Sequence, residues 1–327
     1  MGLYPTNSAD ANKFIINDCE CNILVVEDEK SLQKMWSLRN ELTTVKKIIV
    51  YNDTPDKNQY PDIMTWPEVM ELGKAQSELE LQDRLANMAI NQCSTLVYTS
   101  GTTGNPKGVM LSHDNVYWQA ESCNDFAQFR ESQEIIISYL PLSHIAGQMV
   151  DIWSPLLKKN CVYFADKNAL KGSLLATLKE VRPTILLGVP RVWEKIMEGM
   201  LNKGKDVKGL KKKIGAAAKK AGLEHHLEGK NGFMYNVGQK LVYKKVREAL
   251  GLDRCVSFFT GAAPIGEEVL KYFLSLDIML FDLYGMSEST GPQTMSFFNV
   301  YKLGSVGKTM PGLKSKLADT NEKGEGM

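Results

Sequence analysis

The sequence predicts an α/β protein in which helices flank parallel sheets. Short runs rich in Val, Ile, Leu, Tyr and Phe alternate with longer amphipathic stretches, which is the pattern of parallel strands joined by helices. Most of these runs lack polar alternation, as expected where helices cover both faces of a sheet. The chain has 327 residues, of which 43% are hydrophobic and 24% charged, a composition typical of a globular protein with a large core.

The elements follow one another in a regular order. Strands are expected at 22–27, 47–51, 94–99, 134–140, 161–165, 184–189, 255–260 and 278–284. Helices are expected at 31–42, 113–129, 169–181, 190–201, 235–250 and 267–276. In the last helix, Val269, Leu270 and Phe273 share one apolar stripe. Three prolines and scattered charges in residues 53–81 predict a surface connection with one short helix at 67–73.

Charge and cysteine usage exclude several classes of protein. The 39 basic and 38 acidic residues leave a formal charge of +1, so no overall field attracts nucleic acid, and no nucleic-acid partner is expected. No run approaches the ~20 apolar residues of a membrane-spanning helix, and the first residues do not form a signal peptide. The six cysteines lack the paired spacing of a zinc site, which indicates reduced thiols in a cytoplasmic protein.

One segment departs from the charge balance. Residues Lys203 to Lys220 contain eight lysines and a single acidic residue, Asp206. A lysine near an anionic membrane surface contributes about 1 kcal/mol, so the segment is a candidate peripheral contact with an internal membrane such as the endoplasmic reticulum. A solvated, lysine-rich loop and helix face is the alternative.

The most informative segment runs from Tyr98 to Val109 and reads Tyr-Thr-Ser-Gly-Thr-Thr-Gly-Asn-Pro-Lys-Gly-Val. It follows an apolar strand and precedes an amphipathic stretch, so a strand, a loop and a helix are expected, the arrangement of a phosphate site. Its glycines let backbone N–H groups turn toward an anion, its hydroxyls can bond phosphate oxygens or hydrated Mg²⁺, and Lys107 adds a positive charge. The Walker motif has four residues between its two glycines and its lysine after the second one. Here three residues separate Gly104 from Gly108, and Lys107 precedes Gly108, so the segment is not a Walker motif.

The segment resembles the AMP-binding motif of the adenylate-forming enzymes, which include acyl-CoA synthetases, luciferases and peptide-synthetase adenylation domains. Further segments similar to that family follow in the family's order, at 140–147, 261–265, 282–291 and 304–312. The resemblance implies that His144 lies beside the acyl pocket, that Tyr284 stacks on adenine and that Glu288 helps to bind Mg²⁺. Taken singly, His144 could be a satisfied histidine at a strand end, and Glu288 could cap a helix.

The segment at 188–195 resembles the long-chain fatty acyl-CoA synthetases. The segment at 143–149, together with the one at 282–291, resembles the bubblegum-type long- and very-long-chain group most closely. The implied reaction uses ATP, Mg²⁺ and coenzyme A. A fatty carboxylate attacks the α-phosphorus of ATP, pyrophosphate leaves, and the thiol of coenzyme A attacks the acyl-adenylate. An apolar tunnel for the fatty tail is implied near His144 and the strand at 184–189.

The resemblance assigns roles residue by residue. The implied catalytic residues are Lys107, His144 and Glu288, and the implied metal ligands are Thr99 and Glu288. The implied ATP-binding residues are Thr99, Ser100, Gly101, Thr102, Thr103, Gly104, Asn105, Pro106, Lys107, Gly261, Ala262, Ala263, Tyr284, Gly285, Met286, Ser287, Glu288 and Ser289.

Family members contain further segments before and after the part that this sequence resembles. They include a ribose-binding aspartate, a hinge and a small C-terminal domain that closes the site. We therefore expect residues 1–327 to form part of one large AMP-binding domain, with weak or no activity alone. Two alternatives stay open, namely a noncatalytic nucleotide-binding fragment or short isoform, and an enzyme that adenylates another carboxylic acid.

Overall fold

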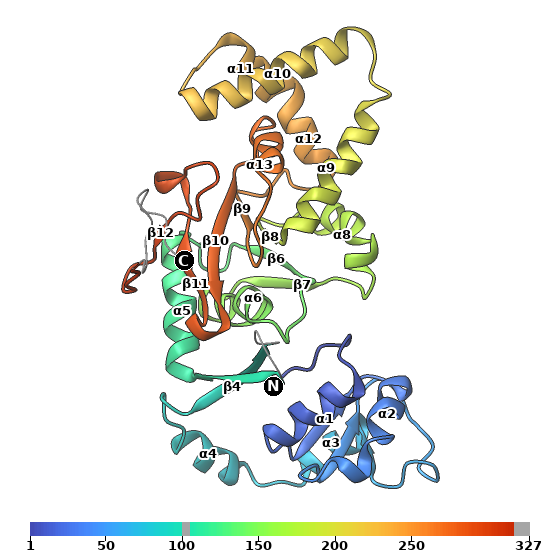
Figure 1. Cartoon of the computed structure of the whole chain (residues 1–327). Helices are drawn as coiled ribbons and strands as arrows, with labels where there is room; N and C mark the ends of the chain where they lie inside the picture. The colour runs from blue at the N-terminus through green and yellow to red at the C-terminus, as the bar shows by residue number, and fades with distance from the viewer. Residues whose placement is uncertain (100–104, 317–327) are drawn as a thin grey trace. The chain divides into compact units, whose positions relative to one another are not determined.

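A computed structural model describes residues 1–99 and 105–316 and confirms the predicted α/β class (Figure 1). The chain divides into two compact units, residues 1–114 and the residues from 115 onward. Each unit has its own sheets and its own core, and each is described by itself. The prediction of one large AMP-binding domain stays a prediction.

The first unit is built on a parallel three-stranded sheet of order β1-β2-β3. Helix α2 begins where Asp28 accepts a hydrogen bond from the backbone of Ser31, and α3 begins with a capping box between Thr65 and Glu68. Its elements are α1 (Ala9–Asp18), β1 (Ile23–Val26), α2 (Glu29–Trp36), a 3-10 turn (Arg39–Glu41), β2 (Lys47–Val50), β3 (Ile63–Thr65), α3 (Trp66–Lys74), α4 (Glu78–Ala86), β4 (Cys93–Thr99) and β5 (Lys107–Ser112).

In the glycine-rich segment, the structure differs from the expected order of strand, loop and helix. Strand β4 pairs antiparallel with β5, with Thr99 opposite Lys107, so Lys107 and Gly108 lie on a strand. The helix α5 (His113–Phe126) begins only after β5 ends. The segment is therefore a hairpin, and a helix N-terminus does not follow it directly.

The second unit contains a five-stranded sheet of order β12-β11-β10-β9-β8 and a parallel pair, β6-β7. Strands β8, β9 and β10 are parallel, whereas β11 and β12 run antiparallel to their neighbours. The strands are β6 (Ile135–Ser138), β7 (Cys161–Phe164), β8 (Ile185–Gly188), β9 (Ser257–Thr260), β10 (Leu280–Met286), β11 (Gly291–Met295) and β12 (Lys308–Thr309).

Helices cover the sheet of the second unit, and Figure 1 shows α9 and α13 beside the strands β8 to β10. These helices are α5 (from residue 115), α6 (Ile145–Gln148), α7 (Ser154–Lys158), α8 (Leu174–Val181), α9 (Pro190–Gly204), α10 (Gly209–Glu228), α11 (Phe233–Gly238), α12 (Lys244–Leu250) and α13 (Glu267–Leu274). Two π-helical segments (Met149–Trp153 and Gln239–Tyr243) and four 3-10 turns (Ala169–Lys171, Ser287–Ser289, Phe298–Val300 and, in the first unit, Arg39–Glu41) complete the described elements.

Alternating side chains on the buried strands pack into two core clusters of the second unit. On β8, Leu186 packs into a cluster with Trp193 and Phe273, while Ile185 and Leu187 pack into another with Phe281. Successive side chains of a strand point to opposite faces, so the two clusters lie on opposite faces of the sheet. All four residues of β8 and of β9 are buried, as the absence of polar alternation predicted.

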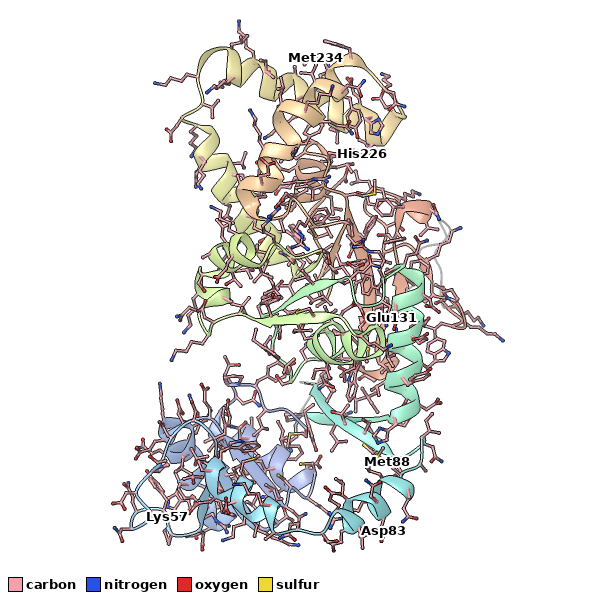
Figure 2. The ribbon with its side chains drawn as sticks, turned by 180° about the vertical axis from the view of Figure 1, so that it is seen from behind. Lys57, Asp83, Met88, Glu131, His226 and Met234 are labelled. Atoms are coloured by element: carbon pink, nitrogen blue, oxygen red, sulfur yellow. The ribbon has the colours of Figure 1, made fainter. Side chains whose placement is uncertain are left out.

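The helices α10, α11 and α12 form an excursion from this sheet (Figure 2, where His226 and Met234 are labelled). Asp277, in the turn after α13, joins the excursion to the sheet. Its carboxylate lies 2.9 Å from His226 Nε2, accepts from the Tyr235 hydroxyl at 2.9 Å and pairs with Arg247 at 3.2 Å. In the part of the chain that the structure describes, no helix combines the length and the apolar character needed to cross a bilayer.

Candidate active site

The described part of the glycine-rich segment presents its polar groups at the end of the β4–β5 hairpin. Thr99 is half-buried at the end of β4, whereas Asn105 and Lys107 are exposed. Gly108 is required, since a Cβ there would lie 2.9 Å from Cζ of Tyr98 on the opposite strand. Pro106 is half-buried, and Ser100, Gly101, Thr102, Thr103 and Gly104 lie outside the described residues.

A hydrogen bond anchors this hairpin to the rest of the first unit. The Tyr98 hydroxyl donates to Asp18 Oδ2 at 2.6 Å. Burial, and then the hydrogen bond to Asp18, raises the pKa of Tyr98 well above its ordinary value, so the phenol stays a donor. The strand β4, which leads into the glycine-rich segment, is thereby fixed to the end of α1.

In the second unit, a small apolar cavity of about 80 Å³ lies between α5, the 144–150 segment and the five-stranded sheet. Three of the segments singled out from the sequence contribute to its wall, through His144, Ala262 and Gly285. The other lining residues are Ala120, Cys123, Ala127, Phe129, Ile145, Ala146, Met149, Val150, Ser154, Ile185, Leu187, Phe259, Leu283, Gly291, Pro292 and Met295. The strand at 184–189 thus lines the cavity, as expected from the sequence.

His144 is one of two titratable side chains in this wall, the other being the thiol of Cys123, and a hydrogen bond defines the tautomer of His144. It is the N-cap residue of α6, and its Nδ1 accepts from the backbone N–H of Ala146 at 3.1 Å. Because Nδ1 is an acceptor, the proton of the neutral ring lies on Nε2. Burial lowers the pKa of His144, which favours this neutral form at neutral pH. The residue therefore offers one N–H donor at an otherwise apolar cavity.

The turn after β9 approaches the cavity closely. Ala262 is exposed, lines the cavity and has φ +68°, a left-handed conformation that is uncommon for a residue with a Cβ. Gly261 packs under β10, where a Cβ would lie 2.5 Å from Cδ1 of Leu283. Such strained positions cluster at ligand sites, which agrees with the adenine-binding role implied for Gly261, Ala262 and Ala263.

The end of β10 presents one aromatic ring and one carboxylate. The Tyr284 side chain is 50% exposed, so its ring is free to stack on a planar ligand. Glu288 is exposed in the 3-10 turn that follows and makes no ion pair within residues 1–99 and 105–316. Met286 is also exposed, and Ser287 is buried.

Ser289 holds this turn together. The Ser289 hydroxyl accepts from the backbone N–H of Met286 at 3.1 Å and donates to the carbonyl of Gly291 at 2.7 Å. It therefore has a structural role in shaping the turn that carries Glu288.

Glu288 fits the requirements of a magnesium ligand, because Mg²⁺ prefers oxygen ligands, keeps several waters and binds through one or two carboxylates together with substrate phosphates. No group of three or more His, Cys, Asp or Glu side chains among the described residues forms an all-protein metal cage. The second implied ligand, Thr99, belongs to the first unit.

Helix α5 contributes residues that the sequence analysis did not assign to the site. Ala120 and Cys123 of α5, and Ala127 in the turn directly after it, line the cavity, and their small side chains are what leave it open. Gln119 fixes the helix to the hairpin of β10 and β11, because its Nε2 donates to the carbonyl of Pro292 at 2.6 Å. The spacing of Ala120 and Cys123, two small residues three positions apart on the predicted helix, was the available signal.

A buried carboxyl group lies behind the cavity wall. Asp151 is 7% exposed in the π-helical segment next to Val150, and its Oδ2 has no hydrogen-bond partner among the described residues. Burial raises the pKa of Asp151 to about 7, although a hydrogen bond with Ser138 opposes this shift. The protonated form is therefore the one that the folded chain favours.

This raised pKa predicts that stability falls as the pH rises. Between about pH 4 and pH 7 the unfolded chain releases the proton of Asp151 while the folded chain keeps it, so the unfolding free energy decreases by about 2 to 4 kcal/mol. Asp151→Asn should remove this slope and stabilise the chain at pH 8 by about 1 to 3 kcal/mol, measured by urea unfolding at several pH values. Asp206→Asn, at an exposed position, is the control, and an unchanged slope in Asp151→Asn would contradict the assignment.

Known proteins resemble this chain over nearly its whole length. A family model described as AMP-binding enzyme matches residues 1–326. The long-chain-fatty-acid–CoA ligase ACSBG2 of Xenopus laevis is 48% identical over 334 residues, covering 100% of this chain and 45% of that protein. The Homo sapiens ligase of the same name is 43% identical (100% and 50% covered), and ligase ACSBG1 of Rattus norvegicus is 41% identical (99% and 46% covered). The chain spans about half the length of these curated relatives.

Solved structures share the fold. The anthranilate CoA ligase AuaEII in complex with anthranoyl-AMP aligns with a TM-score of 0.66 at 17% identity, covering 100% of this chain and 52% of that one. ATP-bound MatB from Rhodopseudomonas palustris aligns with a TM-score of 0.61 at 18% identity, covering 99% and 52%. At these identities the likeness establishes the fold alone.

Proposed function

The chain belongs to the AMP-binding enzyme family, and from this premise we propose that it acts in the ATP-dependent activation of a long-chain fatty acid. The carboxylate is converted to an acyl-adenylate with release of pyrophosphate, and the thiol of coenzyme A then displaces AMP to give the thioester. The proposal draws its substrate class from the long-chain-fatty-acid–CoA ligases that are 41% to 48% identical over nearly the whole chain.

One observation in the structure carries the proposal. The same apolar cavity is lined by His144, by Ala262 in the turn after β9, and by Gly285, which belongs to the segment of Tyr284 and Glu288. An apolar wall suits an acyl chain, while exposed Tyr284 and Glu288 suit a purine and a metal-bound phosphate. The acyl end and the nucleotide end of an acyl-adenylate therefore have adjoining sites in one unit of the chain.

The residues of the chain act by binding and by positioning, since neither half-reaction needs a protein nucleophile. The Nε2–H of neutral His144 would donate to the oxygen of the bound acyl group. The Tyr284 ring would stack on adenine, and Lys107 with the hydroxyls of its loop would hold the phosphates. Glu288 would hold Mg²⁺, which supplies positive charge beside the phosphates when it is bound. The role of Thr99 as a second ligand stays a prediction.

The size of the cavity places a condition on this function. Small-molecule pockets typically have volumes of about 300 to 1,000 Å³, and the described cavity has about 80 Å³. A long acyl chain therefore requires side chains of the wall to move. Met149 and Met295 suit this requirement, because unbranched Met side chains repack at low cost.

Isotope exchange between pyrophosphate and ATP tests the proposal, since it reports acyl-adenylate formation without coenzyme A. We expect weak exchange that depends on added palmitate, in keeping with the weak activity expected of residues 1–327 alone. His144→Asn keeps the N-cap acceptor of α6 but removes the Nε2–H donor, so it should lower exchange about 10- to 100-fold at unchanged stability. ATP binding with no exchange for any acid would favour a noncatalytic nucleotide-binding protein. Exchange with an aryl or amino acid alone would favour the other alternative.

We also propose that the chain works in the cytoplasm at a membrane surface, which would deliver the fatty acid. The lysine-rich segment comprises the end of α9 and the first half of α10, so it is mostly helical. Val207 and Leu210 are exposed among its lysines, a combination that suits contact with anionic lipid. Co-sedimentation with phosphatidylserine vesicles tests this membrane contact, and Lys208→Glu/Lys212→Glu should weaken the binding. Unchanged binding of this double variant would argue against the contact.

A further inference from the structure

A second apolar cavity lies on the other face of the five-stranded sheet, beneath α9. Its volume is about 540 Å³, within the range of small-molecule sites. Its floor is formed by side chains of α8, α9 and α12, among them Leu178, Val192, Ile196 and Met200. The full lining is Ala169, Leu170, Gly172, Leu174, Leu175, Leu178, Val189, Arg191, Val192, Lys195, Ile196, Gly199, Met200, Lys203, Val246, Ala249 and Leu250.

The two cavities are separate. The buried members of the second lining, such as Leu178 and Val192, belong to the core cluster that contains Leu186 of β8. The first cavity is lined by Ile185 and Leu187, which point to the opposite face. The sheet itself therefore stands between the two cavities.

The lip of the second cavity is cationic, in contrast to its floor. Arg191, Lys195 and Lys203 lie along one side of α9, spaced by four and eight residues, with Gly199 between the lysines. Glu194 and Glu198 pair with Arg191 at 3.0 and 3.5 Å. Neither lysine pairs with an acidic side chain within the described ranges, and Lys195 contacts only the carbonyl of Leu170, at 3.3 Å. Two lysines are thus available to an anion at the mouth of an apolar chamber.

We propose that this cavity is a second binding site for a long-chain fatty acid, distinct from the site of acyl activation. The hydrocarbon chain occupies the floor formed by α8, α9 and α12, and the carboxylate pairs with Lys195 and Lys203. A single chain with one anionic head matches the volume and the charge of the cavity, whereas a lipid with two chains exceeds them. The site does not depend on ATP, and it stands whether or not the proposed ligase activity is correct.

Gly199 allows a direct test. A Cβ at Gly199 would meet no atom within 4 Å, so Gly199→Phe should fill the cavity without displacing the helix. Phenylalanine also has a higher helix propensity than glycine, which protects α9 against unfolding. Gly215→Phe is the matched control, because Gly215 lies within α10, has equal space and does not line the cavity.

The experiment is photo-crosslinking of the purified 327-residue chain with a palmitate analogue that carries a diazirine at its methyl end, followed by peptide mapping. We expect labelled peptides from 169–203 and 244–250, a loss of at least tenfold in Gly199→Phe, and no loss in Gly215→Phe. Lys195→Glu/Lys203→Glu should lower the labelling about tenfold, and the corresponding diazirine alcohol, which lacks the carboxylate, should label weakly. Labelling that persists in Gly199→Phe, or that maps only to peptides around His144, overturns the proposal. The labelling needs no ATP, so a failure of ligase activity cannot be mistaken for a failure of this site.

Discussion

Gly285→Ala is expected to destabilise the second unit by about 2 to 4 kcal/mol and to abolish palmitate-dependent exchange. Gly285 lies opposite Pro292 in the β10–β11 hairpin, beside a bulge at Tyr284. A Cβ at Gly285 would lie 2.0 Å from the carbonyl oxygen of Gly291 and 2.7 Å from Cα of Pro292. Both atoms belong to the backbone, so the hairpin must open to admit a methyl group.

The urea unfolding midpoint of the purified chain measures the loss of stability, and exchange measures the loss of the site. Gly215→Ala is the control, since its Cβ would meet nothing and alanine favours the helix by about 1 kcal/mol. A Gly285→Ala chain that unfolds at the same midpoint as the unaltered chain would show that the hairpin is not packed as described.

The central strands were predictable from sequence because burial on both faces leaves an unambiguous signal. The predicted strand at 184–189 contains β8 (Ile185–Gly188), and the predicted strand at 255–260 contains β9 (Ser257–Thr260). Every residue of both strands is buried, and the two polar residues of β9, Ser257 and Thr260, do not alternate with apolar ones.

Strands that form only through pairing with an antiparallel neighbour were harder to predict from their own residues. Residues 107–112, which form β5, include Lys107, Gly108 and Ser112, and only pairing with β4 makes them a strand. The same pairing explains why a strand separates the glycine-rich loop from α5, a helix that begins at His113 as predicted. Strands β11 and β12 were also missed, because each is short and depends on an antiparallel neighbour.

Helix prediction was incomplete at two places. The expected surface connection at 53–81 contains the short helix predicted at 67–73, which is α3, but it also contains β3 and the start of α4, whose residues are all exposed. The expected helix at 235–250 is interrupted by a π-helical segment, where Tyr243 is buried and donates to the carbonyl of Ala218 at 2.5 Å. Tertiary contacts of this kind leave no local periodicity.

The sequence indicated the motifs that contribute to the candidate site, but not the other residues that line its cavity. His144, Ala262 and Gly285 come from segments that are far apart in the chain, and strand ends bring them to one cavity. The small residues of α5 that complete the wall carry no chemical signature. The roles assigned to Lys107 and to the glycine-rich loop stay predictions, as do those of Tyr284 and Ser287.

Glu288→Gln is expected to reduce palmitate-dependent exchange about 10² to 10³-fold and to leave the unfolding midpoint unchanged. The carboxylate is exposed and unpaired within the described part of the chain, so the amide costs the fold little. Gln keeps the size of the side chain but supplies a weaker oxygen ligand without charge, so the Mg²⁺ concentration for half-maximal exchange should rise. Glu268→Gln, at an exposed position of α13, should change neither quantity. Equal loss of exchange at all Mg²⁺ concentrations would instead assign Glu288 a contact with the nucleotide or the acyl group, and normal exchange would remove it from the site.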